Sequence, residues 1–191
     1  MISLFTGARA NAAITLQYKD IINEEGIDCI NFQRGPARQL KNKATVRKVP
    51  IHHQLLELGF VDYVSRKKAK TNAKEDDFIF DDAVHRKSQN YNNKYISRNF
   101  TPFLKEIGIK KGQYDGFDFH SFRDTISLAL QKTLIPSSLV HRIIGWENKE
   151  ISGKFYSKFS LSEIKEGLDK MEYTFLKPHF VEWKKIMAKK P

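Results

Sequence analysis

The sequence predicts an α+β fold that is mainly helical and carries one small antiparallel β-sheet. Most of the chain has apolar residues at helical spacing, whereas two short runs alternate β-branched and polar residues. These two runs follow each other directly, and strands do not alternate with helices as they would in a parallel α/β sheet. At 191 residues and 40% apolar content the chain can bury a sizeable core, and one domain is the expected count.

The first part of the chain is expected to supply two helices and two strands. Residues 2–5 form the end of a helix that Gly7 breaks, and residues 9–17 resume as a helix with Ala12, Ala13 and Leu16 on the buried side. Residues 27–32 and 45–51 predict two adjacent strands, joined by a polar link that contains Gly and Pro.

Helices are expected through the rest of the chain, over residues 53–64, 95–107, 119–134 and 137–144, with Gly145 as the last stop. The entrance Ser121-Phe122-Arg123-Asp124 fits a capping box, and so does Ser160-Leu161-Ser162-Glu163. The second capping box begins a helix with an apolar stripe, and a further segment with large apolar side chains follows it. The stripe is Leu161, Ile164, Leu168 and Met171, and the later side chains are Phe175, Phe180, Trp183, Ile186 and Met187.

Composition points toward nucleic acid and away from a metal or a membrane. The chain has 33 Lys and Arg against 22 Asp and Glu, a net charge of +11 that favours a polyanionic partner. The basic run at residues 66–70 is either a DNA contact or a solvated face. The six histidines show no ligand spacing with Cys29 or with a carboxylate cluster, so no structural metal is expected. Cys29 is expected to be a buried small hydrophobe. The sequence has no apolar run of the length of a membrane span and no signal peptide pattern, which indicates an intracellular protein.

His120 and Arg123 are spaced i, i+3, so their side chains share a helix face. During attack on a phosphodiester, negative charge builds on the non-bridging oxygens, and an arginine fork can hold two of them. Arg9 begins a helix after Gly7, where backbone N–H groups also favour an anion. Either arginine alone would more often be a surface ion pair, but together they suit phosphoryl transfer.

A tyrosine hydroxyl, with a pKa near ~10, must lose its proton as it attacks, and His120 is suited to accept that proton. Lys41 can donate a proton to the departing 5′ oxygen, with Lys43 as the alternative two residues away. The residues by themselves do not choose among seven tyrosines: Tyr18, Tyr63, Tyr91, Tyr95, Tyr114, Tyr156 and Tyr173.

These motifs, in this order, resemble the catalytic domain of the tyrosine recombinases, the phage-type integrases. In that family an arginine follows a Thr-Gly pair, and a lysine lies in a β-hairpin ahead of a Val-Pro strand. A His-x-x-Arg then opens a helix, Gly-His or Gly-Trp follows, and the tyrosine comes about ten residues later. The matching residues are Arg9 after Thr6-Gly7, Lys41 before Val49-Pro50, His120 with Arg123, Trp146 after Gly145, and Tyr156. The resemblance extends from residue 1 to about residue 160 and implies that these six residues are catalytic.

Three positions depart from the family pattern. Ala12 stands where a glutamate commonly follows the first arginine by three residues, so a weaker orientation of Arg9 is expected. Trp146 stands where histidine is commoner, and its indole N–H can donate the same hydrogen bond to a phosphate without carrying charge. Asp124 follows Arg123 where a histidine is frequent, and this difference has no evident consequence.

The resemblance implies site-specific recombination or integration of double-stranded DNA. Tyr156 would attack a phosphate, form a 3′-phosphotyrosyl link and release a 5′ hydroxyl. Because that link conserves the bond energy, neither a metal nor a cofactor is expected. The family further implies a monomer when free, a homotetramer on DNA, and a cytoplasmic, nucleoid-associated protein of a phage or prokaryotic mobile element.

Residues 1–173 are expected to form the catalytic domain, and residues 174–191 a C-terminal tail. The tail either completes its own core or docks on a neighbouring subunit. A helical core-binding domain usually precedes the catalytic domain in this family, and this sequence contains none, so we expect a catalytic fragment or a natural truncation.

Two other functions fit the same motifs. A type IB topoisomerase would reseal the same strand after rotation, and a DNA-binding module would keep the fold without activity. Ala12 favours the inactive module, whereas the presence of Arg9, His120, Arg123 and Tyr156 argues against it.

Overall fold

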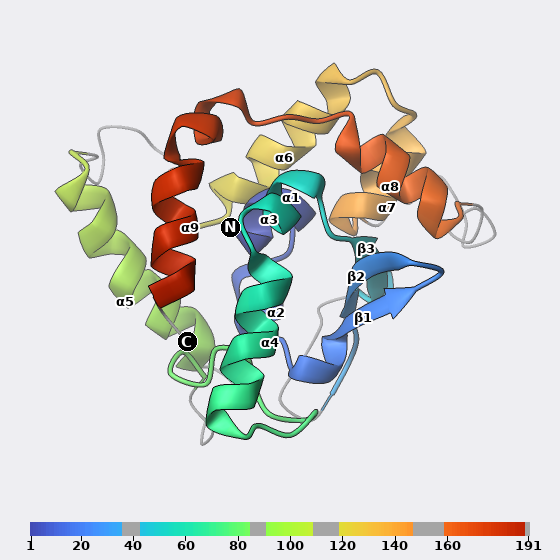
Figure 1. Ribbon diagram of the computed structural model, residues 1–191. Coiled ribbons are helices and arrows are strands. Elements are labelled where there is room, and N and C mark those ends of the chain that lie inside the picture. The colour runs from blue at the N-terminus through green and yellow to red at the C-terminus, as the bar shows by residue number, and fades with distance from the viewer. Residues whose placement is uncertain (36–42, 85–90, 109–118, 147–158, 190–191) are drawn as a thin grey trace.

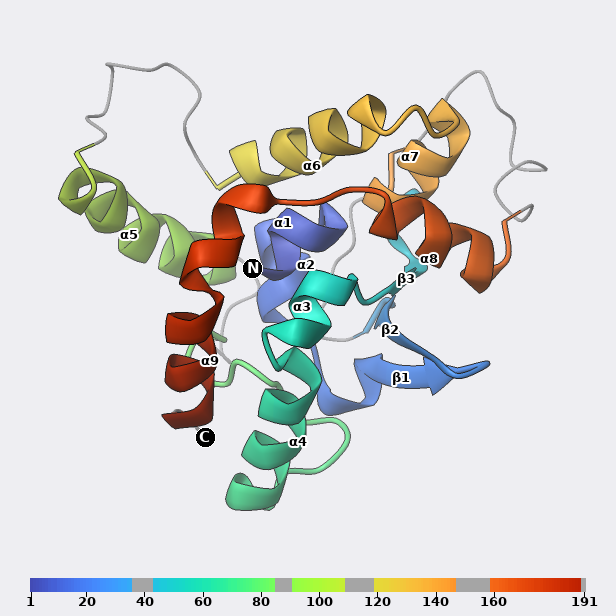
Figure 2. The ribbon, with the colours of Figure 1, turned by 45° about the horizontal axis from the view of Figure 1, so that its top comes forward.

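The computed structural model describes residues 1–35, 43–84, 91–108, 119–146 and 159–189, and shows a helical body with a three-stranded sheet on one flank (Figures 1 and 2). The α-helices described are α1 (Ile2–Thr6), α2 (Ala10–Ile14), α3 (His53–Glu57), α4 (Phe60–Thr71), α5 (Tyr91–Glu106), α6 (Ser121–Lys132), α7 (Ser137–Ile144), α8 (Leu161–Asp169) and α9 (Phe180–Lys189). The strands are β1 (Ile21–Glu24), β2 (Ile27–Phe32) and β3 (Arg47–Pro50), and the 3-10 segments are η1 (Tyr18–Asp20), η2 (Lys43–Thr45) and η3 (Thr174–His179). The predicted α+β class is confirmed. Within these ranges, none of the helices is both long enough and apolar enough to cross a membrane.

The sheet is antiparallel with the order β1-β2-β3. Ile30 of β2 pairs with Val49 of β3, and Phe32 pairs with Arg47, so these four side chains share one face of the sheet. All four are buried. The strand over residues 27–32 was predicted correctly, whereas β1, which turns into β2 at Glu25-Gly26, was not predicted. Cys29 is buried as expected, and burial raises the pKa of its thiol to about 11.

The short helix α1 lies inside the molecule, and all five of its residues are buried. Helix α6 packs across it, as Figure 2 shows. Helix α1 ends at Gly7, which has a φ of 64° and caps the helix in the left-handed conformation that glycine adopts without strain. The predicted helix break at Gly7 is therefore confirmed.

Two predicted helices have different bounds in the structure. The helix expected over residues 9–17 is only α2, although Ala12, Ala13 and Leu16 are buried as predicted. The helix expected over residues 53–64 is two helices, because Gly59 has a φ of 78° and turns the chain between α3 and α4. Apolar residues on both sides of Gly59 gave the appearance of one continuous face.

The C-terminal helices agree closely with the sequence pattern. Helix α7 spans the predicted residues and ends at Gly145. The Ser160 hydroxyl accepts from the Glu163 amide at 3.2 Å, and the Glu163 carboxylate accepts from the Ser160 amide at 2.7 Å, which confirms this capping box. Along the α8 stripe, Ile164, Leu168 and Met171 are buried and Leu161 is half-buried. Helix α9 then packs beside α4.

Candidate active site

The Arg123 guanidinium joins three segments that lie far apart in the sequence. Arg123 is 2% exposed on the first turn of α6. Its Nη1 donates to the carbonyl of Gly7, 116 residues away, and its Nη2 donates to the carbonyl of Gly145 at 3.0 Å. The guanidinium carbon lies 6.0 Å from the centroid of a Trp146 ring. The entrance of α6, the turn before Arg9 and the end of α7 therefore meet at one side chain.

Gly7 and Gly145, whose carbonyls bind Arg123, both have a backbone conformation that favours glycine and lie too close to other atoms for a side chain. Gly145, like Gly7, has a positive φ, of 69°. A Cβ at Gly7 would lie 2.9 Å from side-chain atoms of Ile144, and a Cβ at Gly145 would lie 2.7 Å from Nη1 of Arg47 and 2.9 Å from the Ala44 carbonyl oxygen. Larger residues would push the segments apart, so glycine sets the spacing around Arg123.

Arg9 is the N-cap residue of α2 and is half-buried. Its Nη1 donates to the Thr45 hydroxyl at 3.4 Å, a long hydrogen bond that links it to the segment entering β3. Ala12 is 3% exposed and has no polar group to orient an arginine. Thr45, which sequence reasoning did not single out, therefore provides an orienting contact from another element.

Trp146 follows α7 directly and is half-buried. Its backbone N–H donates to the His141 carbonyl at 3.0 Å, and its ring centroid lies 5.5 Å from that of His141. The end of α7 thus fixes the tryptophan backbone, and the His141 ring packs against the indole.

His120 is exposed at the start of α6, and its carbonyl accepts from the Arg123 amide at 2.8 Å. Phe119 and Phe122 pack on each other and on Phe100 of α5, with ring centroids 5.2 to 5.7 Å apart. The predicted capping box at Ser121 is wrong: His120 holds the N-cap position without a side-chain cap bond, and Ser121 is already helical. The ring contacts of Phe119 and Phe122 hold the residues on both sides of His120 against α5.

The remaining predicted catalytic residues, Lys41 and Tyr156, lie outside the described residues. Lys43, the alternative lysine, begins η2, which leads through Thr45 into Arg47 at the start of β3. The structure therefore brings together Arg123, Trp146 and the turn that precedes Arg9, with His120 at the helix entrance.

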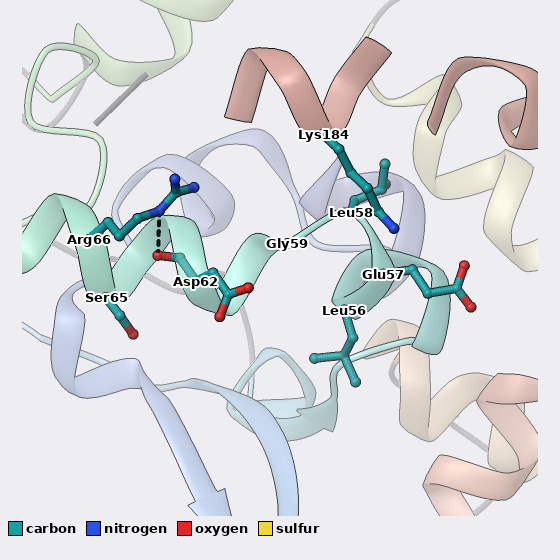
Figure 3. Close-up of a pocket in the computed structure, with 8 residues that line it drawn as sticks. All are labelled: Leu56, Glu57, Leu58, Gly59, Asp62, Ser65, Arg66 and Lys184. Atoms are coloured by element: carbon teal, nitrogen blue, oxygen red, sulfur yellow. Dashed lines mark hydrogen bonds between the residues drawn. The ribbon is translucent and has the colours of Figure 1, made fainter. Parts of the chain in front are cut away.

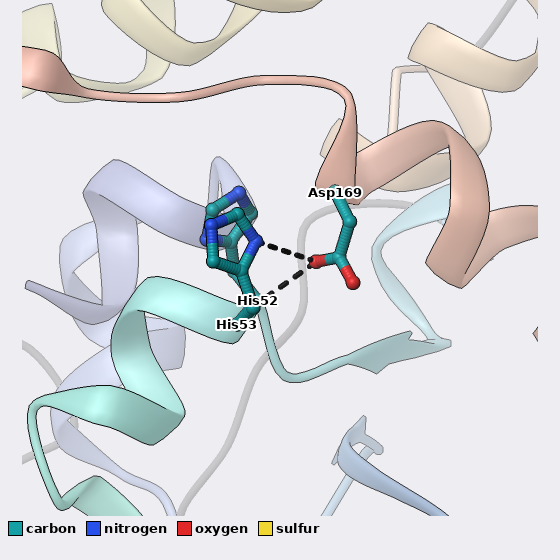
Figure 4. A group of neighbouring side chains, drawn as sticks. All are labelled: His52, His53 and Asp169. Atoms are coloured by element: carbon teal, nitrogen blue, oxygen red, sulfur yellow. Dashed lines mark hydrogen bonds and ion pairs between the residues drawn. The ribbon is translucent and has the colours of Figure 1, made fainter.

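A second polar cluster contains His52, His53 and Asp169, whose potential ligand atoms lie within 4.8 Å of one another (Figure 4). Asp169 accepts from the His53 amide at 3.1 Å and lies 3.3 Å from His53 Nδ1. His52 Nδ1 accepts from the Gln54 amide at 3.1 Å, which leaves Nε2 to donate to the Met171 carbonyl at 2.8 Å. Because both His52 ring nitrogens are engaged, we assign no metal here.

His52 is instead the centre of a neutral network, which we call the histidine latch: His52, Gln54, Met171 and Tyr173. The Gln54 side chain bonds both the amide and the carbonyl of Tyr173, at 2.9 and 3.3 Å. The Tyr173 hydroxyl donates to the Leu4 carbonyl at 2.9 Å. Burial lowers the pKa of His52 to about 4, so it is neutral near pH 7.

A pocket of about 610 Å³ lies between the α3–α4 turn and α9 (Figure 3). Its lining mixes acidic and basic side chains, namely Glu57, Asp62, Arg66 and Lys184, with Leu56, Leu58, Gly59 and Ser65. None of the candidate catalytic residues that the structure describes lines it, so we assign it no part in the chemistry.

The basic run over residues 66–70 is partly neutralised. Lys67 lies 2.8 Å from a carboxylate oxygen of Asp81, and Lys68 pairs with Glu75. These pairs favour the reading of a solvated face, and DNA contact at this run stays a prediction.

The sequence comparison agrees with the motifs that meet at Arg123. The model of the phage integrase family matches residues 1–161, and the chain belongs to that family. At the level of the family, this membership supports DNA binding and site-specific recombination. No curated protein and no solved structure gave a significant match.

Proposed function

We propose that the chain is the catalytic domain of a site-specific tyrosine recombinase with the DNA breaking–rejoining fold. The observation that carries the proposal is the meeting at Arg123 of the turn before Arg9, the His120 helix entrance and the Gly145-Trp146 step. A buried guanidinium with fixed orientation is suited to a phosphate because its planar fork donates several N–H groups in defined directions.

In this mechanism, the Tyr156 hydroxyl attacks a DNA phosphorus while His120 accepts its proton. Arg9, Arg123 and the Trp146 indole N–H stabilise the charge on the non-bridging oxygens. The bond from phosphorus to the 5′ oxygen breaks, and Lys41 protonates that oxygen. A 5′ hydroxyl of a partner strand then reverses the steps, which releases Tyr156 and joins the two strands. The exposed position of His120 supports its access to a bound substrate.

The test is covalent trapping on a nicked duplex that carries the attachment sequence of the source element. Tyr156→Phe is expected to abolish the adduct, because it removes the attacking oxygen, while DNA binding is retained. Tyr63→Phe is the matched control: burial raises the pKa of Tyr63, which makes its hydroxyl a poorer nucleophile. An adduct that persists in Tyr156→Phe would assign the attack to another residue. Joined strands from two duplexes, rather than relaxed circles from one, distinguish a recombinase from a topoisomerase.

We also propose that residues 1–173 form the catalytic unit and that residues 174–191 form a tail able to dock on a neighbouring subunit of a DNA-bound tetramer. Tyr173 is 4% exposed, whereas Phe175 and Val181 just beyond it are 59% and 65% exposed. This change supports a boundary at residue 173. In the isolated chain α9 rests against α4, which is the alternative position for the tail.

A further inference from the structure

Arg47, the first residue of β3, is 3% exposed and donates to three main-chain carbonyls. Its Nε donates to Ile143 at 2.8 Å, its Nη1 to Thr45 at 3.1 Å and its Nη2 to Thr6 at 2.9 Å. The guanidinium carbon also lies 4.8 Å from the ring centroid of Phe32, its cross-strand partner. Phe32 and these three carbonyls fix both the position and the plane of the guanidinium.

Two of the three carbonyls belong to segments that carry proposed catalytic residues, and the third belongs to η2, which begins at the alternative lysine, Lys43. Thr6 precedes the turn that ends at Arg9, and Ile143 lies three residues before Trp146. Thr45 ends η2, which begins at Lys43. The Thr45 hydroxyl in turn accepts from Arg9, so Arg47 holds the backbone of a residue whose side chain contacts the first arginine.

We propose that Arg47 is a positioning residue for DNA cleavage: it holds η2, the Arg9 turn and the Gly145-Trp146 step in fixed relation around Arg123. This inference rests on the proposed function. Gly145 adds independent support, because a Cβ at that position would lie 2.7 Å from Arg47 Nη1, which leaves the arginine little room to move. Arginine is required because its donors form a rigid planar fork, whereas lysine presents one ammonium on a flexible stem.

The test compares Arg47→Lys and Arg47→Met with Lys48→Ala in the nicked-duplex assay. Lys48 is the neighbouring residue on the opposite face of β3, where it pairs with Glu24, and it makes no contact with the three carbonyls. Arg47→Met leaves buried carbonyls without their donor and is the variant at risk of unfolding, so Arg47→Lys is the decisive variant. Thermal unfolding defines a temperature at which each variant is folded.

Arg47→Lys is expected to lower the single-turnover rate of adduct formation by about 100-fold, because small misplacements of reacting groups cost about that much. Its DNA affinity should stay near that of the wild type, because the charge is kept. Lys48→Ala should keep the wild-type rate. A folded Arg47→Lys protein with the wild-type rate would overturn the proposal, and so would a loss of rate that follows entirely from lost DNA binding.

The indole N–H resonance of Trp146 gives a second readout that needs no DNA. Trp183→Phe assigns the two indole signals of the chain, after which Arg47→Lys should shift the Trp146 signal and Lys48→Ala should not. An unchanged Trp146 signal in Arg47→Lys contradicts the positioning role. If the wild type forms no adduct while the indole signal shifts as expected, the proposed function fails and the positioning of Trp146 by Arg47 stands.

Discussion

Two networks fasten segments that are distant in the sequence, but with different chemistry. Arg123 and Arg47 with their carbonyl partners reach across as many as 116 residues, and the histidine latch across as many as 169. The arginines are charged donors that hold segments carrying proposed catalytic residues. The latch is neutral and holds the end of α8 and the residues after it to α1 and α3. Burying either network requires that its polar groups be satisfied. The charged contacts thus hold the proposed site together, whereas the neutral contacts close the fold at its C-terminal part.

Arg123→Ala should have the largest effect and should separate the two regions most clearly. Adduct formation is expected to fall by at least about 100-fold, because a fixed charge donor is lost. Stability should fall by roughly 2–5 kcal/mol, because two buried carbonyls lose a donor and a cavity opens. Single-turnover trapping and urea unfolding measure the two effects. Leu128→Ala, at an exposed position of the same helix, is the control. Wild-type turnover in folded Arg123→Ala would remove this residue from the site.

His52 predicts a pH dependence of stability that originates in the latch. Its pKa is about 4 in the folded protein and about 6.5 when unfolded, so the unfolded state binds the extra proton between these values. The contribution of neutral His52 to the free energy of unfolding is therefore fully present above pH 6.5. It is lost as the pH falls toward 4, by about 3 kcal/mol in all. The free energy of unfolding, measured from pH 7 to 4, should fall with decreasing pH. This dependence should be weaker in His52→Gln and unchanged in the control His179→Gln, at an exposed position. Equal slopes in wild type and His52→Gln would contradict the burial argument.

Gly145→Ala should destabilise the fold less than Arg123→Ala does. It should disturb the arginine contacts and leave the latch unchanged. The new Cβ would displace Arg47 and strain a positive φ, whereas Gly26→Ala, at a φ of 77° with no atom within 4 Å of its Cβ, meets only the strain. That strain alone is worth about 1–2 kcal/mol. Gly145→Ala is therefore expected to destabilise the chain more than Gly26→Ala does and to slow adduct formation. Equal unfolding free energies for the two variants would show that the close approach at Gly145 has no energetic weight.

Deleting residues 174–191 should have the smallest effect on the fold, because the latch ends at Tyr173 and most of the side chains described after it are exposed, although Leu176 and Phe180 pack against the core. The deletion should weaken assembly on paired DNA sites and let each subunit cleave independently. Gel mobility on paired sites and the ratio of singly to doubly cleaved product report these changes. If both stay as in the full chain, the tail is an ordinary terminal packing element.

Local signals in the sequence were sufficient for elements whose ends are set by nearby residues. The stop at Gly145 and the capping box from Ser160 to Glu163 were predicted correctly because each depends on residues within one turn. Strand β1 was missed because Ile21 and Ile22 are adjacent and do not alternate with polar residues. The boundary at Gly59 was missed because apolar side chains continue on both sides of it.

The site was predicted less completely because its geometry depends on distant carbonyls. The resemblance selected Arg9, Arg123 and Trp146. In the structure Trp146 lies against Arg123, the turn before Arg9 is bonded to Arg123, and the Arg9 side chain contacts Thr45. Arg47 was missed although a signal existed: Arg47, Val49 and Ile51 alternate along the chain, which sets a charged residue on the buried face of a strand. No sequence pattern indicates that its partners are carbonyls of residues 6, 45 and 143.

The carbonyl partners of Arg123 and Arg47 have a consequence for the electrostatic potential at the site. A carboxylate would hold a guanidinium as firmly, but its full negative charge would cancel the positive one. A carbonyl is a dipole, and the carbonyls at the end of α7 also present the negative end of a helix to both arginines. Such contacts stabilise buried positive charge and offset less of it than the full charge of a carboxylate would. The two arginines can therefore be held rigidly and still attract an anion.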